Sequence, residues 1–203
     1  MIWANPCFQR WKGVIKRCYA PSSVSDNSYA GTVVCDEWLR FSAFEAWMLA
    51  RKWEGNDIDK DFLSLNEKLY SPETCAFLPK EINYFLGSSP GRRGELPLGV
   101  SFEKSRGNYA AYASVGGKST ALGRCAEPHE AHRRYQAAKL AVGERLYDAY
   151  LNRVDSRAMA SMRTILDKLS DDLEAGRETH SLHPINLPEK YKQMIKDQLS
   201  NLL

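Results

Sequence analysis

The sequence predicts an α+β protein, and three observations support this class. Apolar residues recur every three or four positions in several long segments, which is the period of an amphipathic helix. Alternating runs on both sides of Gly116-Gly117 predict an antiparallel hairpin. The order strand, turn, strand, helix is predicted over residues 57–83. We therefore expect small antiparallel sheets with helices packed on them.

Length and composition are those of an ordinary globular protein. The 203 residues can bury one good core or two small ones, and 43% of them are apolar and 26% charged. No apolar run reaches membrane-spanning length, and the N-terminus does not resemble a signal peptide. The five cysteines are widely spaced and odd in number, which favours a reducing compartment over a secreted disulfide framework. We expect a cytoplasmic protein without a membrane partner.

The first fifty residues predict two amphipathic helices that contribute aromatic side chains to a core. The helices are expected at Phe8–Tyr19 and Phe41–Trp53. Between them we expect a polar loop at Pro21–Tyr29 and a short buried strand at Val33–Cys35.

The stretch from Asp57 to Asn83 is the expected location of the chemistry. An alternating run at Ile58–Phe62 predicts a strand, and Leu69–Tyr70 predicts a return strand after a polar turn at Leu65–Lys68. A helix should begin at Pro79, because proline is favoured at the first helical position. Carboxylates on the first strand and an amide on the helix are a compact way to hold one divalent metal.

The second half predicts a sheet, a long helix and a helical tail. Residues 87–94 form the clearest linker and are expected to separate two modules. Strands at 98–103, 108–115 and 119–123 should form an antiparallel sheet, with the helix 127–150 packed across it. The tail should contain helices at 159–175 and 188–202, joined by a loop at 180–187.

The net charge of +3 is concentrated in the middle of the chain. Residues 91–150 contain ten Lys or Arg and six Asp or Glu, whereas residues 1–90 contain ten and eleven and residues 151–203 eight and eight. A basic middle segment is typical of nucleic-acid contact, and a solvated basic surface is the alternative interpretation.

Several sequence blocks occur in an order that is more specific than any one of them. They are Trp11, Arg17-Cys18-Tyr19, Val34–Trp38, Asp59-Lys60-Asp61, Tyr70–Cys75 and Ile82-Asn83. Together they resemble a phage-type HNH endonuclease family. The segment 99–139 resembles the Apetala-type (ethylene-response-factor-like) DNA-binding domain that such proteins often carry. The resemblance covers about residues 8–150 and implies an HNH-like ββα-metal module at 1–86 and a DNA-binding domain at 95–150, on either side of the linker at 87–94. Residues 151–203 match no part of it and are expected to form a helical tail.

The resemblance implies a role for each matching residue. Asp59 falls at a metal-ligand position and Asn83 at the final ligand position of the helix, so Mg²⁺ or a similar ion is expected. Thr74 occupies the place of a loop-bracing asparagine. Lys60 replaces the general-base histidine, and a lysine protonated at pH 7 cannot take a proton from water, so it would contact the scissile phosphate. Asp61 would assist at the same site.

Two functions from different classes remain open. The first is metal-dependent nicking or cleavage of duplex DNA by a phage or mobile-element protein in a bacterial cell. The second is a catalytically inactive descendant, which acts as a DNA-binding repressor or as an inhibitor of a host defence protein. At the level of the site, Asp59, Lys60 and Asp61 are either catalytic or only a solvated strand face. The tail helices are expected to bind a partner or to form a homodimer.

The DNA-contacting side chains implied by the second module are mostly basic. They are Arg92, Arg93, Lys104, Arg106, Tyr112 and Lys118. Contacts with backbone phosphates fit this set better than base reading, because serine, glutamate and alanine stand where the plant-type domain has arginine and tryptophan. Tyr109 is expected in the core.

Cysteines and histidines give weaker signals. Cys18, Cys35 and Cys75 lack the paired spacing of a zinc site, so buried structural thiols are favoured over a structural zinc. His129 and His132 are expected in surface or capping roles rather than as metal ligands. His180 and His183 lie in a loop and belong to no motif.

Overall fold

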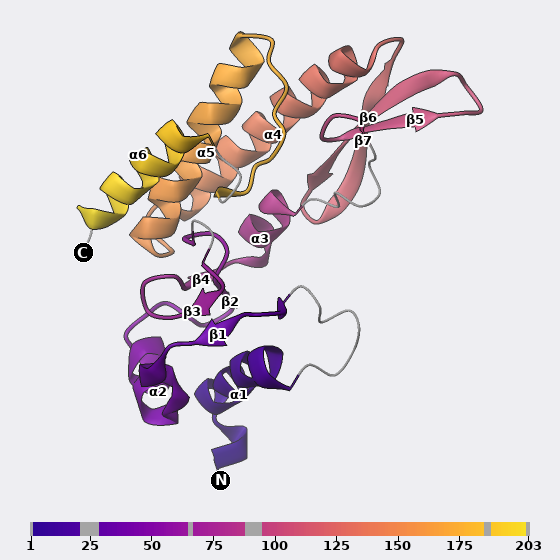
Figure 1. The fold of residues 1–203 in the computed structure, drawn as a ribbon. Coiled ribbons are helices and arrows are strands. Elements are labelled where there is room, and N and C mark those ends of the chain that lie inside the picture. The colour runs from indigo at the N-terminus through magenta and orange to yellow at the C-terminus, as the bar shows by residue number, and fades with distance from the viewer. Residues whose placement is uncertain (1, 21–28, 65–66, 88–94, 185–187, 202–203) are drawn as a thin grey trace.

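The computed structural model describes residues 2–20, 29–64, 67–87, 95–184 and 188–201. Most of the expected loop at 21–29, turn residues 65–66 and linker residues 88–94 lie outside this range. The chain is a mixed α+β protein, as predicted. Figure 1 shows helices α1 and α2 with the short strands β1–β4 at one end, and a three-helix layer with a three-stranded sheet at the other.

The N-terminal part is built on two helices, α1 (Pro6–Tyr19) and α2 (Phe41–Leu49). Helix α1 begins where the Asn5 side chain accepts hydrogen bonds from the Cys7 and Phe8 N–H groups, which is a favourable N-cap. Helix α2 is four residues shorter than the expected segment 41–53, because the chain leaves the helix at Ala50 and turns at Gly55, whose φ is +74°. The short 3₁₀ helices η1 (Ile2–Ala4) and η3 (Asp36–Leu39) complete this part.

Four short strands form two separate ladders in this part. Strand β1 (Val33–Val34) pairs in parallel with β3 (Leu69–Tyr70), and β2 (Asp57–Asp59) pairs antiparallel with β4 (Ala76–Leu78). The expectation that Leu69–Tyr70 is the return strand for residues 58–62 is therefore wrong. The return strand is β4, and α3 (Lys80–Leu86) follows it directly. The order strand, strand, helix is kept, with a longer loop between the two strands.

The three-stranded antiparallel sheet is confirmed. Its strands β5 (Val100–Glu103), β6 (Asn108–Val115) and β7 (Lys118–Cys125) run in sequence order, with a register shift at Ala111/Tyr112. Helix α4 (Pro128–Tyr150) packs across one face through Ala131 and Tyr135. Tyr109 is partly buried on this face, as predicted.

The tail helix α5 (Ser156–Glu174) packs beside α4, and α6 (Glu189–Ser200) packs on the other side of α5, as Figure 1 shows. One apolar cluster joins them to the segment that includes β4 and α3, and so crosses the expected boundary at 87–94. Its largest fully buried side chains are Phe62, Leu78, Ile82, Phe85, Met159, Met162 and Ile165. The tail is thus part of the core that supports the β2–β4–α3 segment.

His132 on α4 connects this helix to the segment before β5 and to the loop after α5. Its ring is buried, with Nδ1 2.9 Å from the Leu98 carbonyl oxygen, and its Nε2 accepts a hydrogen bond of 3.0 Å from the Thr179 N–H. The expected surface or capping role is therefore wrong for His132, because the loop after α5 folds back over this helix face. The Leu98 carbonyl needs a proton on Nδ1, and the Thr179 N–H needs a lone pair on Nε2, so the ring is neutral.

This geometry predicts a loss of stability in mild acid. Burial lowers the pKa of His132 below its ordinary value of 6.5, although the Leu98 carbonyl and the carboxylates of Glu178 and Asp172 oppose the shift. The unfolded chain then binds the proton first, so the free energy of unfolding should fall as the pH drops from about 6.5 toward the folded pKa. Unfolding titrations between pH 7.5 and 5 should show this slope, and His132→Gln should reduce it. The contradicting result is a slope unchanged in His132→Gln; His129→Gln, at an exposed position, is the control.

Candidate metal site and DNA-binding surface

Asp59 is the last residue of β2, and its side chain accepts hydrogen bonds from the turn that follows. Its Oδ1 atom accepts hydrogen bonds from the Asp61 N–H at 2.9 Å and the Phe62 N–H at 2.7 Å. Burial raises the pKa of this carboxyl group, although both backbone bonds act in the opposite direction. Desolvation of a carboxylate is offset when a cation binds beside it. Its Oδ2 atom takes no part in either backbone bond.

Lys60 is buried, with 7% of its surface exposed, and its ammonium group forms an ion pair with the Asp61 carboxylate. The interpretation of residues 59–61 as a solvated strand face is therefore wrong for Lys60. The Asp61 side chain remains 46% exposed, so this pair opens to solvent on the aspartate side.

Asn83 lies on α3, the helix that follows β4. Its Oδ1 atom is buried and has no hydrogen-bond partner among the described residues. A buried acceptor without a partner costs about 1–3 kcal/mol and is uncommon in native proteins. An amide oxygen in this environment is suited to coordinate a cation or to accept a hydrogen bond from a ligand.

Thr74 and Arg157 stabilise the loop between β3 and β4. The Thr74 hydroxyl donates to the Leu69 carbonyl at 2.6 Å and accepts from the Ser71 N–H at 3.1 Å. Arg157, at the start of α5, donates to the carbonyls of Pro72, Glu73 and Cys75 at 3.0–3.3 Å. The tail thus holds the loop that leads into β4, a role that no sequence pattern around Arg157 predicts.

The three cysteines of the expected structural set lie together in the N-terminal core. Cys75 is fully buried, and Cys18 and Cys35 are partly buried against the same cluster. Burial raises the pKa of Cys75 to about 12, and it also raises the pKa values of the other two. At neutral pH all three thiols are protonated packing groups.

His183 lies near this site, although no sequence motif includes it. Its charge interactions with Asp61 and Lys60 show that it lies near their ion pair, and burial lowers its pKa. Its Nδ1 atom is buried without a hydrogen-bond partner among the described residues. His183 reaches this place because the neighbouring Leu182 is buried in the core that joins the tail to residues 62–86. No local pattern around His183 indicates such a position.

The donor set fits a weakly held hard cation better than a closed metal cage. Asp59 and Asn83 offer oxygen atoms, and one of these oxygens is an orphaned buried acceptor. Within the described ranges, no three His, Cys, Asp or Glu side chains are placed to hold a metal together. Mg²⁺ is often bound by one or two protein oxygens, with water and substrate phosphates completing the shell.

The outer face of the three-stranded sheet is organised around an acidic residue, Glu103. Arg124 donates to its carboxylate at 2.8 and 3.3 Å, Arg106 lies 3.5 Å away, and the Tyr112 hydroxyl donates at 3.1 Å. These contacts lower the pKa of Glu103, first through Arg124. Arg124 was missed because the third strand was expected to end at residue 123. Two arginines on this face are therefore partly neutralised.

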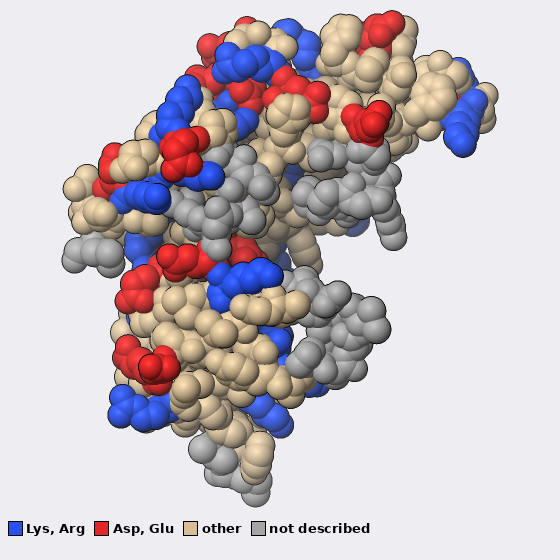
Figure 2. Space-filling view, viewed as in Figure 1, with Lys and Arg blue, Asp and Glu red and all other residues tan. Residues whose placement is uncertain are grey.

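The remaining expected DNA contacts are dispersed. Lys104 lies in the β5–β6 turn and Lys118 at the start of β7, and both are exposed. Arg92 and Arg93 lie outside the described residues. Figure 2 shows basic atoms at the tip of the sheet, and acidic and basic atoms interspersed over the helices on this side of the molecule. The visible surface carries its basic side chains in separate places rather than in one continuous basic stripe.

Comparison with known proteins adds no assignment. The chain matches no protein-family model, and searches of curated proteins and of solved structures gave no match. Among the helices that the structure describes, none is long and apolar enough to cross a bilayer.

Proposed function

We propose that this chain binds duplex DNA and nicks it with a divalent metal held between Asp59 and Asn83. The observation that carries the proposal is the buried Oδ1 of Asn83, on the helix that follows the β2–β4 ladder, for which the described part of the chain supplies no hydrogen-bond partner. The desolvated carboxyl group of Asp59 at the end of β2 supports it. The resemblance to HNH endonucleases supplies the reaction class.

The residues around the site have separate roles in this proposal. The metal, when bound, would polarise the scissile phosphate and stabilise charge on the leaving oxygen. Asp59 would use Oδ2 for the metal while Oδ1 keeps the turn at Asp61 and Phe62. Lys60 is paired and buried, so it contributes positive charge rather than proton transfer.

His183 is the candidate proton acceptor in place of the missing hairpin histidine. Its lowered pKa keeps the ring neutral at pH 7, and its Nδ1 has a free lone pair in that state if the proton is on Nε2. A neutral imidazole near the reaction can take a proton from the attacking water.

A plasmid-nicking assay with Mg²⁺ or Mn²⁺ tests this proposal. Asp59→Asn keeps an oxygen for the turn but removes the charge, and Asn83→Ala removes the amide. Each should reduce nicking on the order of 100-fold or more, which is the loss expected when a metal site is disabled. Asp57→Asn is the matched control on the same strand, since Asp57 is half-exposed and lies 3.7 Å from Arg10. Absence of nicking by the wild type, or equal nicking by Asp59→Asn, would remove the enzymatic proposal.

A second candidate is a non-cleaving descendant that acts as a DNA-binding repressor or as an inhibitor of a host protein. The Lys60–Asp61 ion pair and the acidic Glu103, which pairs with Arg124 at the end of the edge strand β5, favour it. A gel-shift series in increasing salt separates its two forms. DNA affinity that falls steeply with salt indicates phosphate contacts and a DNA binder. Failure to shift DNA even at low salt would leave protein binding as the function of this descendant.

A further inference from the structure

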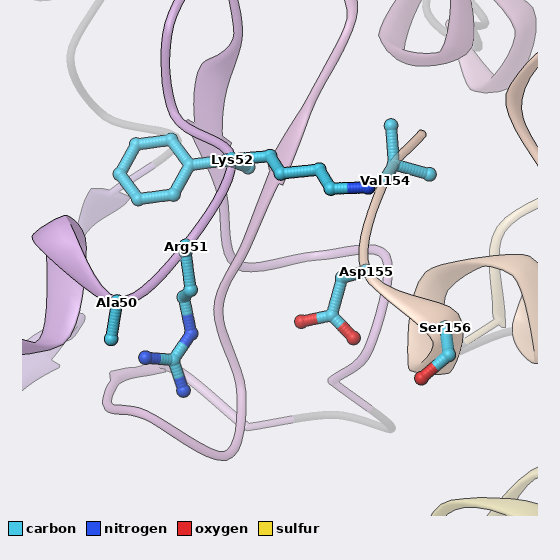
Figure 3. Close-up of a pocket in the computed structure, with 7 residues that line it drawn as sticks. Ala50, Arg51, Lys52, Val154, Asp155 and Ser156 are labelled. Atoms are coloured by element: carbon cyan, nitrogen blue, oxygen red, sulfur yellow. The ribbon is translucent and has the colours of Figure 1, made fainter. Parts of the chain in front are cut away.

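A cavity of about 260 Å³ lies between the N-terminal part and the tail. It is bounded by Arg51 and Lys52 just after α2, by Phe77 of β4 and by residues 154–156 at the start of α5. In Figure 3, Arg51 and Asp155 extend from opposite walls in the same direction, while Lys52 reaches across toward Val154. The volume is many times the ~30 Å³ that one water occupies in the liquid.

The charges around this cavity leave an excess of positive charge. Arg51, Lys52 and Arg157 are cationic, and Asp155 and Glu73 are the carboxylates that interact with Arg51. The Asp155 carboxylate is already engaged, because it pairs with Arg157 at 2.7 Å. An anion is therefore the complementary ligand.

Arg51 is held in position before any ligand arrives. Its guanidinium lies 4.5 Å from the centre of the Trp47 ring and donates one hydrogen bond of 2.8 Å to the Trp47 carbonyl. Burial and the nearby Arg157 charge lower its pKa, and an anion beside it would relieve both effects. A guanidinium has five N–H donors, so most of its donors are not used by this contact.

Lys52 supplies a second fixed cation. Its Nζ atom donates to the Asn152 carbonyl at 2.8 Å, which connects the end of α2 to the turn before α5. An ammonium group has three donors, so two are left for a ligand. A fork-shaped guanidinium beside a point-charge ammonium matches the oxygens of a phosphate group.

We propose that this cavity binds a phosphate group, with Arg51 and Lys52 as its ligands. The phosphate is either free, as inorganic phosphate or a small phosphate ester, or part of a nucleic-acid backbone. Phe77 lies on β4 opposite Ile58 of β2, so its side chain lies on the other face of this ladder from Asp59 and the cavity is separate from the candidate metal site. The inference does not depend on DNA cleavage.

The test is a titration of the 203-residue chain with inorganic phosphate at constant pH and ionic strength, in which backbone amide chemical shifts are measured. Saturable shifts are expected at residues 51, 52 and 154–156. Arg51→Gln and Lys52→Gln should each weaken binding about 10-fold, the effect of losing one charge-assisted hydrogen bond. Lys196→Gln, at an exposed position on α6, should bind phosphate as the wild type does.

A short DNA duplex then identifies the source of the phosphate. If the duplex shifts the same amides and inorganic phosphate competes with it, the ligand is a backbone phosphate. If the duplex leaves these amides unchanged, the ligand is a small phosphate compound. The proposal is overturned if tens of millimolar phosphate produce no saturable shift, or if Lys52→Gln, a surface change that should not affect folding, binds phosphate as tightly as Lys196→Gln.

Discussion

Replacing Arg157 with methionine should lower the free energy of unfolding by about 3–5 kcal/mol, the range measured when one partner of a buried ion pair is removed. Only 7% of the surface of Arg157 is exposed, and its guanidinium serves four partners. They are the Asp155 carboxylate and the carbonyl oxygens of Pro72, Glu73 and Cys75. Methionine fills a similar volume but leaves these acceptors without donors in a buried place.

Arg163 on the same helix provides the matched control. It pairs with Glu144 at 2.7 Å and with Asp167 at 2.8 Å, but these carboxylates are more than a third exposed. Exposed pairs contribute little, so Arg163→Met should cost about 0–1 kcal/mol. Urea denaturation of both variants measures the difference. Equal losses in the two variants would mean that Arg157 does not tie α5 to the loop before β4.

A second large effect is expected for Gly99→Ala, at the entrance to β5. Gly99 has φ +73°, a conformation that costs an alanine about 1–2 kcal/mol. An added Cβ would also lie 2.0 Å from the Tyr135 ring and 2.8 Å from the Tyr112 carbonyl oxygen. Overpacking of this kind costs a further 1–3 kcal/mol, so the total loss should be about 2–5 kcal/mol.

Gly107→Ala separates the backbone effect from the steric one. Gly107 has φ +65°, and a Cβ added there would meet no atom within 4 Å. We expect a loss of about 1–2 kcal/mol from the backbone conformation alone. Thermal or urea unfolding should rank Gly99→Ala as clearly more destabilised. If the two variants are equally stable, Gly99 does not hold the close approach between α4 and the sheet.

Long periodic segments were predictable from the sequence, and short ones were not. The 23-residue helix α4 and the hairpin at Gly116-Gly117 carry enough periodic residues and turn chemistry to define themselves. Strands of two or three residues are too short to show the two-residue alternation of apolar and polar side chains. No local pattern therefore shows that Leu69–Tyr70 pairs with β1 instead of β2. Their pairing is decided by the core around them.

The same distinction applies to the candidate site. Asp59 and Asn83 could be named because they lie in a contiguous strand, strand, helix unit. His183 and Arg157 could not, because the tail brings them to this unit through a shared apolar core. The sequence also does not distinguish a buried lysine such as Lys60 from an exposed one, because the burial of this side chain depends on its tertiary surroundings.

Calorimetric titration of the 203-residue chain with Mn²⁺ tests most directly whether Asp59 and Asn83 share one divalent cation. We predict one saturable site in the wild type and in Asp57→Asn, with affinity at least about 10-fold weaker in Asp59→Asn and in Asn83→Ala. No saturable Mn²⁺ binding by the wild type, or binding that is unchanged in Asn83→Ala, would contradict the account.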